Sequence, residues 1–208
     1  MKHSDILKRS DEFFSRKIKE LGPTPEGSDY NSKEAQEIRF QQFRKLFDRT
    51  RTFSINDYGC GYGALAHFLG EHGYTFTYSG FDISKDAITY ARNLAQEKSH
   101  WDFFTDQNEL AVADYSVACG IFNLKFDADV DAWEAYILDT LDTISNISKL
   151  GFGFNMLTKY SDRDRMRHNL YYGDPLFFFD YCKKKFSRNI ALLHDYNLYD
   201  FTILVRLA

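Results

Sequence analysis

Short apolar runs alternate with segments of helical periodicity along most of the chain. The runs have the length and the apolar or aromatic content of buried strands, and helical spacing follows the first, second and fourth of them. The five runs fall near residues 53–57, 76–82, 101–105, 114–119 and 151–157. This alternation predicts an α/β protein with a doubly wound, mostly parallel sheet and short connections.

Two helices are predicted before the first strand. Residues 4–21 carry one apolar helical face, which Gly22 and Pro23 end. After a turn-rich linker, Asn31 and Glu34 match a capping box at the start of a second helix. The chain is therefore expected to form helical segments before its sheet begins.

An apolar strand that ends in an acid leads directly into three alternating glycines. Asp57 closes the strand, and Gly59, Gly61 and Gly63 supply a turn where no Cβ blocks the close approach of a ligand. A helix follows at once, so the backbone N–H groups at its start are expected to face the ligand as an anion site. A dinucleotide fingerprint has its third glycine where Ala64 stands, and the nicotinamide pattern tolerates alanine there, so the spacing alone leaves the cofactor open.

A second acid ends the next strand. Asp82 lies 19 residues beyond Gly63, where a strand-end carboxylate can accept hydrogen bonds from both hydroxyls of a ribose. Ser84 then caps a helix whose apolar face begins at Ala87. These features indicate a cofactor that contains a ribose.

The segments Asp57-x-Gly-x-Gly-x-Gly63 and Gly80-Phe-Asp82-Ile83-Ser84 resemble the first two motifs of the class I S-adenosylmethionine-dependent methyltransferases. Further matches at 103–107 and 114–123 follow in the family's order. The resemblance implies a Rossmann-like methyltransferase fold with a seven-stranded sheet and N-terminal capping helices. It also implies a C-terminal antiparallel hairpin, which residues 189–193 and 200–206 fit.

The resemblance further assigns contacts with the cofactor S-adenosylmethionine and its product S-adenosylhomocysteine. The glycines pass the methionine part, Asp82 holds the ribose, Asp106 bonds the adenine amino group, and the fourth strand ends beside the sulfonium. The N-terminal segment resembles a leader of some bacterial members, which implies that Tyr30 and Arg39 hold the cofactor's carboxylate and shield its sulfonium. The implied cofactor-binding residues are Tyr30, Arg39, Gly59, Cys60, Gly61, Asp82, Ile83, Asp106 and Cys119.

A single catalytic domain fits the length of 208 residues and the apolar content of 44%. The expected parts are capping helices in 1–50, a cofactor-binding core in 51–160, a substrate lid and helix in 161–188, and the terminal hairpin in 189–208. The predicted activity is methyl transfer (EC 2.1.1.-) to an oxygen or nitrogen atom of a small-molecule acceptor.

Methyl transfer requires little acid–base machinery, because the sulfonium already carries a good leaving group. A hydroxyl acceptor still needs a base, and His194 in the hairpin turn is the candidate catalytic residue for that role. Tyr171, Tyr172 and Phe122 are candidate walls of the acceptor pocket, since their ring faces can stabilise a cation.

Composition narrows the range of partners. The 26 basic and 30 acidic side chains give a net charge of −4, so no overall basic field attracts nucleic acid. No apolar stretch is long enough to span a bilayer, and no clear trio of acids predicts a metal site. Three distant cysteines fit reduced thiols in the cytoplasm better than a disulfide framework or a zinc site. A small molecule is therefore the expected acceptor, and the oligomeric state stays open.

Two other functions remain open at this point. Tyr181 and Lys185 match the Tyr-x-x-x-Lys pair of short-chain dehydrogenases, which makes an NAD(P)-dependent oxidoreductase the alternative enzyme. The third reading is a noncatalytic relative that binds the cofactor and supports a partner protein.

Overall fold

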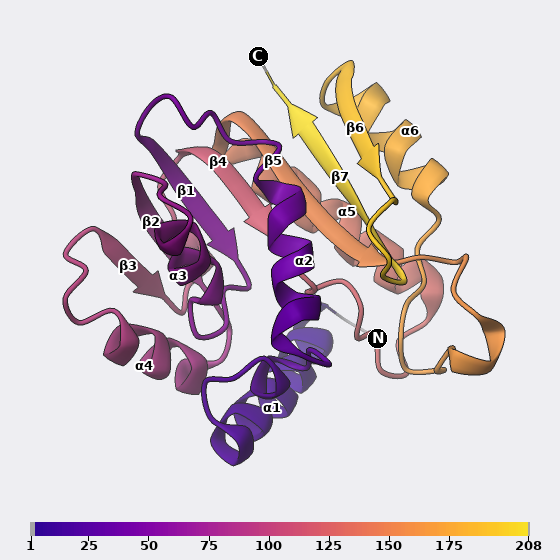
Figure 1. Ribbon diagram of the computed structural model, residues 1–208. Coiled ribbons are helices and arrows are strands. Elements are labelled where there is room, and N and C mark those ends of the chain that lie inside the picture. The colour runs from indigo at the N-terminus through magenta and orange to yellow at the C-terminus, as the bar shows by residue number, and fades with distance from the viewer. Residues whose placement is uncertain (1–2, 208) are drawn as a thin grey trace.

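The computed structural model describes residues 3–207, in which seven strands form one sheet in the order β3-β2-β1-β4-β5-β7-β6 (Figure 1). The strands are β1 (Phe53–Tyr58), β2 (Phe76–Phe81), β3 (Trp101–Phe104), β4 (Ala113–Ala118), β5 (Ser148–Leu157), β6 (Asn189–Leu193) and β7 (Asp200–Arg206). Strands β1 to β5 pair in parallel, and β7 runs antiparallel to both of its neighbours. The predicted sheet and C-terminal hairpin are confirmed; residues 1, 2 and 208 of the predicted terminal segments lie outside the described residues.

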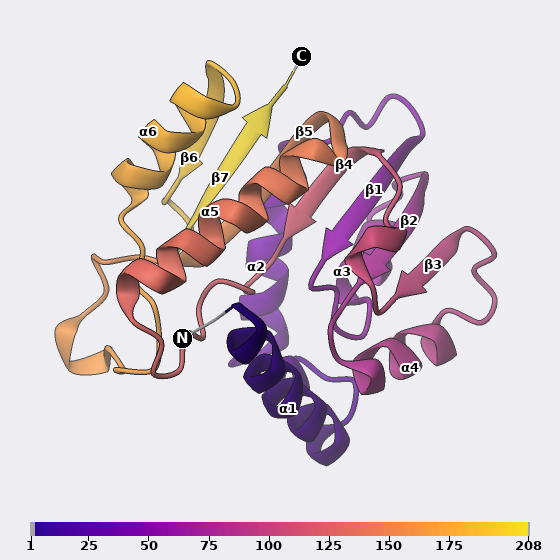
Figure 2. The same cartoon turned by 180° about the vertical axis from the view of Figure 1, so that it is seen from behind.

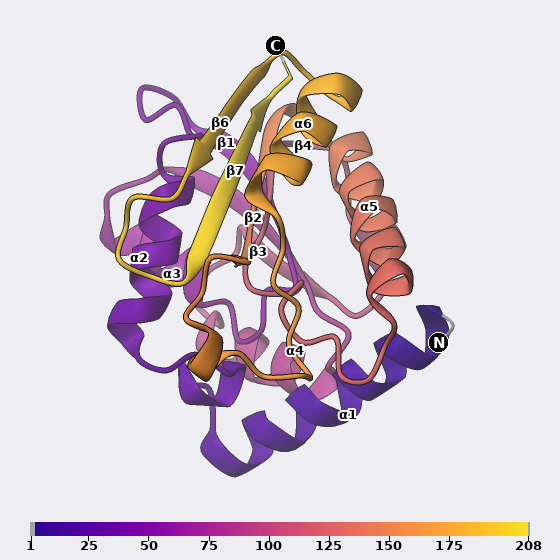
Figure 3. The same ribbon diagram turned by 90° about the vertical axis from the view of Figure 1, so that its right-hand side faces the viewer.

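Helices cover both faces of the sheet (Figures 2 and 3). They are α1 (His3–Leu21), α2 (Lys33–Phe43), α3 (Ala64–Glu71), α4 (Lys85–Leu94), α5 (Val130–Asn146) and α6 (Pro175–Lys185), with short 3₁₀ turns η1 (Glu26–Ser28), η2 (Gln107–Glu109) and η3 (Arg163–Arg165). Phe43, Leu65 and Ala91 from α2, α3 and α4 belong to the core cluster on one face. Trp133 of α5 and Phe178 of α6 belong to the cluster on the other face. Each face of the sheet is therefore buried by its own helical layer.

Helix α1 lies across the carboxyl end of the parallel strands (Figures 1 and 3). The hydroxyl oxygens of Ser15 and Ser84 are 2.7 Å apart, and Lys19 pairs with Asp86 at 2.9 Å, so α1 is fastened to the start of α4. Ile6 is 1% exposed and packs into the core. The N-terminal helix thus covers the edge of the sheet where α/β proteins bind ligands.

Side-chain caps begin the helices next to this edge. Ser84 accepts a hydrogen bond from the backbone N–H of Ala87 at 3.2 Å, as the sequence predicts. The predicted cap at Asn31 is wrong by one residue: Ser32 has the extended backbone of an N-cap, and its hydroxyl accepts from the N–H of Ala35 at 3.1 Å. Helix α2 therefore starts one residue later than the capping-box pattern indicates.

A buried ion pair fastens α2 to the last strand. The Nε and Nη2 atoms of Arg39 donate to the two carboxylate oxygens of Asp200 at 3.1 and 2.6 Å. The Nη1 atom donates to the carbonyl oxygen of Ala35 at 2.7 Å. The side chains of Arg39 and Asp200 are only 11% and 1% exposed, so each charge is shielded from water and is stabilised by the opposite charge of its partner.

We expect Asp200→Ala to lower the free energy of unfolding by about 3–5 kcal/mol, because it leaves the buried Arg39 charge without its counter-ion. Urea titration followed by circular dichroism measures this loss. The matched control is Lys184→Ala, which removes an ion pair with Asp180 whose side chains are 75% and 58% exposed, and which should change stability far less. Equal losses in the two variants would contradict a stabilising role for the buried pair.

Candidate active site

A cavity of about 1350 Å³ opens at the carboxyl ends of the parallel strands, beneath α1 and α2. Its wall combines the loop after β1, the segments that follow β2, β3 and β4, the leader before α2, and part of the lid. The wall contains every residue that the sequence resemblance assigns to the cofactor: Tyr30, Arg39, Gly59, Cys60, Gly61, Asp82, Ile83, Asp106 and Cys119. The fold thus brings residues that are far apart in the sequence, from Tyr30 to Cys119 at the end of β4, to one surface.

The glycine loop makes room at the end of β1. Gly59 has a φ of 86°, and a Cβ there would lie 2.2 Å from the Cγ2 atom of Ile121. Gly61 has a φ of 55°. A side chain at Gly59 would combine an unfavourable backbone with a collision in the cavity wall, whereas at Gly61 the positive φ alone favours glycine.

Three backbone amides of the glycine loop already have hydrogen-bond partners within the protein. The N–H groups of Gly59 and Cys60 both donate to the carbonyl oxygen of Phe81, at 2.7 and 2.9 Å. The N–H group of Gly63 donates to the carbonyl of Cys60 at 2.9 Å. The amides of Gly59 and Cys60 therefore fasten the loop to β2, and that of Gly63 closes the loop on itself. The anion site expected at the start of α3 stays a prediction.

Asp82 stands at the centre of the wall. One carboxylate oxygen accepts from the N–H of Gly61 at 2.8 Å, and the other accepts from the N–H of Ser84 at 2.9 Å. Burial raises the pKa of Asp82, and these two amides partly oppose that rise. Each oxygen retains a free lone pair, so the carboxylate is held in place and can still accept from a ligand.

Asp57 is a second buried acid in the wall, at the end of β1. Its carboxylate accepts a hydrogen bond from the hydroxyl of Tyr78 at 2.7 Å. Burial raises the pKa of Asp57 to about 7; the Tyr78 hydrogen bond lowers it and the charge of Asp82 raises it further. A positively charged ligand group near Asp57 would stabilise its ionised form.

Tyr30 covers the end of β4. Its hydroxyl donates to the carbonyl oxygen of Cys119 at 3.2 Å and lies 3.3 Å from the Cys119 sulfur. The guanidinium of Arg39 lies over the Tyr30 ring, 5.4 Å from its centre. Burial raises the pKa of Cys119 to about 12 and that of Tyr30 well above its usual range. Both side chains are therefore neutral hydrogen-bonding groups near neutral pH and not bases.

Sequence reasoning missed the residues that support this part of the wall. Asn155 on β5 accepts from the N–H of Gly120 at 2.8 Å and donates to Asp200 at 3.3 Å. Asp200 in turn holds Arg39. The available signal was a lone acid at the start of the apolar run 200–206, because an acid in such a run needs a buried partner.

Asp106 follows β3 at the far end of the wall. Its carboxylate accepts from the backbone N–H and the side-chain amide of Asn108, at 2.9 and 2.8 Å, and thereby caps η2. Asp106 thus stabilises a turn, as acids often do, and also lines the cavity.

The structure does not bring the candidate base His194 to the cavity wall. The residue is exposed, and its ring lies 6.2 Å from that of Tyr160 and 6.4 Å from that of Phe201. Of the candidate aromatic walls, Tyr172 lines the cavity. Tyr171 and Phe122 are wrong as wall residues, because they are buried in the core behind the cavity.

The lid is joined by backbone hydrogen bonds to the loop between β4 and α5. The N–H of Phe126 donates to the carbonyl of Asn169 at 3.0 Å, and the N–H of Tyr171 donates to that of Asn123 at 2.8 Å. Arg165 and Arg167 of the lid line the cavity. These two arginines are not predictable from the sequence as cavity residues, since a charged loop gives no periodic signal.

Residues 3–207 contain no group of three histidine, cysteine or acidic side chains arranged to hold a metal ion. No helix in the described part of the chain is both long and apolar enough to cross a bilayer.

Comparison with known proteins identifies the family. A family model described as a methyltransferase domain matches residues 51–149. Rv1506c of Mycobacterium tuberculosis (strain ATCC 25618 / H37Rv), which bears a provisional methyltransferase name, is 47% identical over 164 residues, covering 79% of this chain and 99% of that protein. The chain belongs to the class I S-adenosylmethionine-dependent methyltransferases. Because the chain belongs to this family, the alternative function of an NAD(P)-dependent oxidoreductase, which rested on Tyr181 and Lys185, is rejected.

Solved structures share the fold of this methyltransferase at low sequence identity. The DhpI-SAH complex has a TM-score of 0.66 and 12% identity, with 100% of this chain and 99% of that chain covered. The CurJ carbon methyltransferase has a TM-score of 0.57 and 12% identity, with 83% of this chain and 53% of that chain covered. The fold is therefore shared with a protein solved as an SAH complex and with a carbon methyltransferase.

The raised pKa of Asp57 predicts a pH-dependent stability for this methyltransferase. The ordinary pKa of an aspartate is 3.8, and that of Asp57 in the folded chain is about 7. At a pH between these two values, the folded chain keeps a proton on Asp57 that the unfolded chain has released. The free energy of unfolding therefore falls as pH rises through this window, and the loss is complete above the folded pKa. Asp57→Asn cannot release this proton and lacks this loss. The free energy of unfolding of the variant, relative to that of the wild type, should therefore be greater at about pH 8 than at about pH 5.

Denaturant titrations of the ligand-free protein at both pH values measure this difference. Asp102→Asn, at an exposed position on β3, is the control and should differ from the wild type by the same amount at both pH values. The same pH-independent behaviour in Asp57→Asn would show that Asp57 ionises normally.

Proposed function

We propose that this methyltransferase transfers the methyl group of S-adenosylmethionine to an oxygen or nitrogen atom of a small-molecule acceptor. The observation that carries the proposal is the cavity, in which the glycine loop and the acids Asp82 and Asp106 line one wall. Its volume of about 1350 Å³ exceeds the roughly 300–1,000 Å³ of a typical ligand pocket. The cavity therefore has room for an acceptor beside the cofactor.

The proposed cofactor site extends along the strand ends. Asp82 accepts from the ribose hydroxyls through its free lone pairs, with Ile83 beside it, and Asp106 accepts from the adenine amino group. Gly59, Cys60 and Gly61 give the methionine part room to pass. Tyr30, Arg39 and Cys119 surround the carboxylate and the sulfonium, although Asp200 already neutralises the charge of Arg39 and leaves it only its remaining N–H donors.

The proposed step is a direct displacement. A lone pair on the acceptor atom forms a bond to the methyl carbon while the carbon–sulfur bond breaks, and the sulfur keeps that electron pair as a neutral thioether. A proton leaves the acceptor atom where it carries one. The protein aligns the three atoms and keeps water out, which α1 and the lid favour by covering the cavity.

Oxygen or nitrogen is preferred as the acceptor atom because these atoms carry a lone pair. Removing a proton from carbon requires a strong base, whereas Cys119 and Tyr30 stay protonated at the end of β4. His194 lies away from the cavity wall, so no proton transfer is routed through it. We also place the protein in the cytoplasm, because Cys60, Cys119 and Cys182 are buried free thiols.

Calorimetric titration with S-adenosylmethionine, S-adenosylhomocysteine and NADH tests the cofactor, and transfer of a tritiated methyl group to a panel of small alcohols and amines tests the reaction. We expect micromolar binding of the two adenosyl compounds and incorporation of label into at least one acceptor. Binding without transfer to any alcohol or amine would contradict the proposed reaction and favour the noncatalytic relative.

We expect Asp82→Ala to weaken S-adenosylhomocysteine binding by about 1–3 kcal/mol, the scale for loss of a charged hydrogen-bond acceptor. Isothermal titration calorimetry gives the dissociation constant directly. Asp102→Ala, an exposed acid on the neighbouring strand β3 that does not line the cavity, should bind like the wild type. Unchanged affinity in Asp82→Ala would remove Asp82 from the cofactor site.

A further inference from the structure

The cavity has opposite charge at its two ends. Five acids line it, and all but Asp164 belong to the leader, to the end of β1 or to the segments after β2 and β3: Asp29, Asp57, Asp82, Asp106 and Asp164. Four basic side chains line it, two near the cofactor end and two on the lid: Lys17, Arg39, Arg165 and Arg167. Acids thus dominate the proposed cofactor end, and arginines dominate the lid end.

The basic side chains at the cofactor end are neutralised. Lys17 pairs with Asp29, and Arg39 pairs with Asp200 at 2.6 Å. Within residues 3–207, neither Arg165 nor Arg167 lies within ion-pair distance of any carboxylate. Uncompensated positive charge in the cavity is therefore confined to the lid end.

The two acids of the same lid segment, Asp162 and Asp164, form no ion pair with either arginine in the described chain. Asp162 accepts a hydrogen bond from the hydroxyl of Tyr199, and the guanidinium of Arg165 lies over the Tyr199 ring, 5.9 Å from its centre. Asp164 is the one lid acid in the described cavity wall, against two arginines. By contrast, Lys159 of the same loop has its own partner, Asp174, at 2.7 Å.

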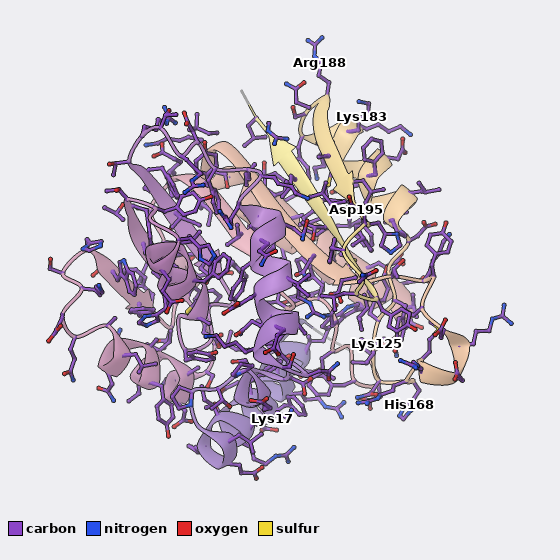
Figure 4. The ribbon with its side chains drawn as sticks, in the orientation of Figure 1. Lys17, Lys125, His168, Lys183, Arg188 and Asp195 are labelled. Carbon is purple, nitrogen blue, oxygen red and sulfur yellow. The ribbon has the colours of Figure 1, made fainter. Side chains whose placement is uncertain are left out.

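One further lysine, Lys125, lies at the same end of the molecule. Figure 4 labels Lys125 and His168 near the lid, whereas Lys183 and Arg188 lie at the opposite end of the sheet. The Nζ atom of Lys125 donates to the carbonyl oxygen of Ala128 at 3.2 Å and has no carboxylate within ion-pair distance in the described chain. Lys125, Arg165 and Arg167 thus carry charges that no ion pair within the described chain neutralises, although the whole chain has a net charge of −4.

The lid backbone holds these arginines over the cavity. In addition to the bonds from Phe126 and Tyr171, Leu124 and Leu170 form an antiparallel bridge, and Thr158 and Gly173 form a parallel one. Both arginine side chains are exposed, and the guanidinium of Arg165 lies over the Tyr199 ring. The planar donors of a guanidinium match the oxygens of a phosphate or a carboxylate.

We propose that the acceptor carries a phosphate or carboxylate group, which Arg165 and Arg167 bind at the lid end of the cavity. This inference rests on the proposed function. The anionic group is an anchor, because guanidinium groups withdraw electron density from the oxygens that they bind and make them poor nucleophiles. The methylated oxygen or nitrogen is a separate atom of the acceptor, nearer to the end of β4.

The test titrates the protein saturated with S-adenosylhomocysteine with phenyl phosphate, phenylacetate and benzyl alcohol at constant ionic strength. The two anions should bind about tenfold or more tightly than the neutral alcohol. The better of the two anions then distinguishes a phosphate anchor from a carboxylate anchor. Equal binding of all three probes, or no binding of either anion at millimolar concentration, overturns the proposal.

Matched variants locate the anion. Arg165→Gln and Arg167→Gln should each weaken binding of the better anion about tenfold or more and leave S-adenosylhomocysteine affinity unchanged. The control is Arg163→Gln, which removes the same charge from the same turn at a residue that does not line the cavity, and which should stay within about twofold of the wild type. An equal loss in all three variants would show a general charge effect and overturn the site.

The same titrations without S-adenosylhomocysteine separate this inference from the proposed function. Failure of the protein to bind S-adenosylhomocysteine contradicts the proposed function. Anion binding that persists and depends on Arg165 and Arg167 but not on Arg163 supports the anion site even in that case.

Discussion

The ion pair between Arg39 and Asp200 joins the two ends of the chain around the cavity. The residues are 161 positions apart, and both are almost removed from water, so neither charge is stable in this place without the other. Asn155 extends the contact from Asp200 to the backbone of Gly120 at the end of β4. The covering helix α2, the terminal hairpin and the central strand end are consequently held in one arrangement, and the position of Tyr30 over the cavity follows from it.

This pair also decides the charge that a ligand meets. Asp200 neutralises Arg39, whereas Asp57 and Asp82 have no basic partner within ion-pair distance in the described chain, and burial raises the pKa of both. Such acids are stabilised by a ligand that brings hydroxyl donors and positive charge. S-adenosylmethionine brings both, and the opposite sign at the lid suits an anionic acceptor. The two reactants of the proposed reaction are thus drawn to different ends of one cavity.

The parts of this structure that depend on local pattern were predictable. The strands, the glycine loop and the cap at Ser84 follow from residues within a few positions of one another, and the resemblance extended them to a family and a set of nine cavity residues. Features set by distant partners were not. The Arg39–Asp200 pair leaves no periodic trace, the amides of Gly59 and Cys60 turned out to bind the neighbouring strand, and the direction of the hairpin turn kept His194 away from the cavity.

The fold determines the cofactor end of the cavity more closely than the acceptor end. Structures that superpose on this chain with TM-scores of 0.66 and 0.57 have only 12% of their residues in common with it, and one of them is a carbon methyltransferase. A sheet that is preserved under such divergence fixes where strand ends meet, and hence where a shared cofactor can bind. It does not fix the lid, whose contacts with the β4–α5 loop are made by backbone atoms and leave the side chains free to vary. Information about the acceptor must therefore be sought in side chains such as Arg165 and Arg167, whose charge serves no evident purpose in holding the fold together.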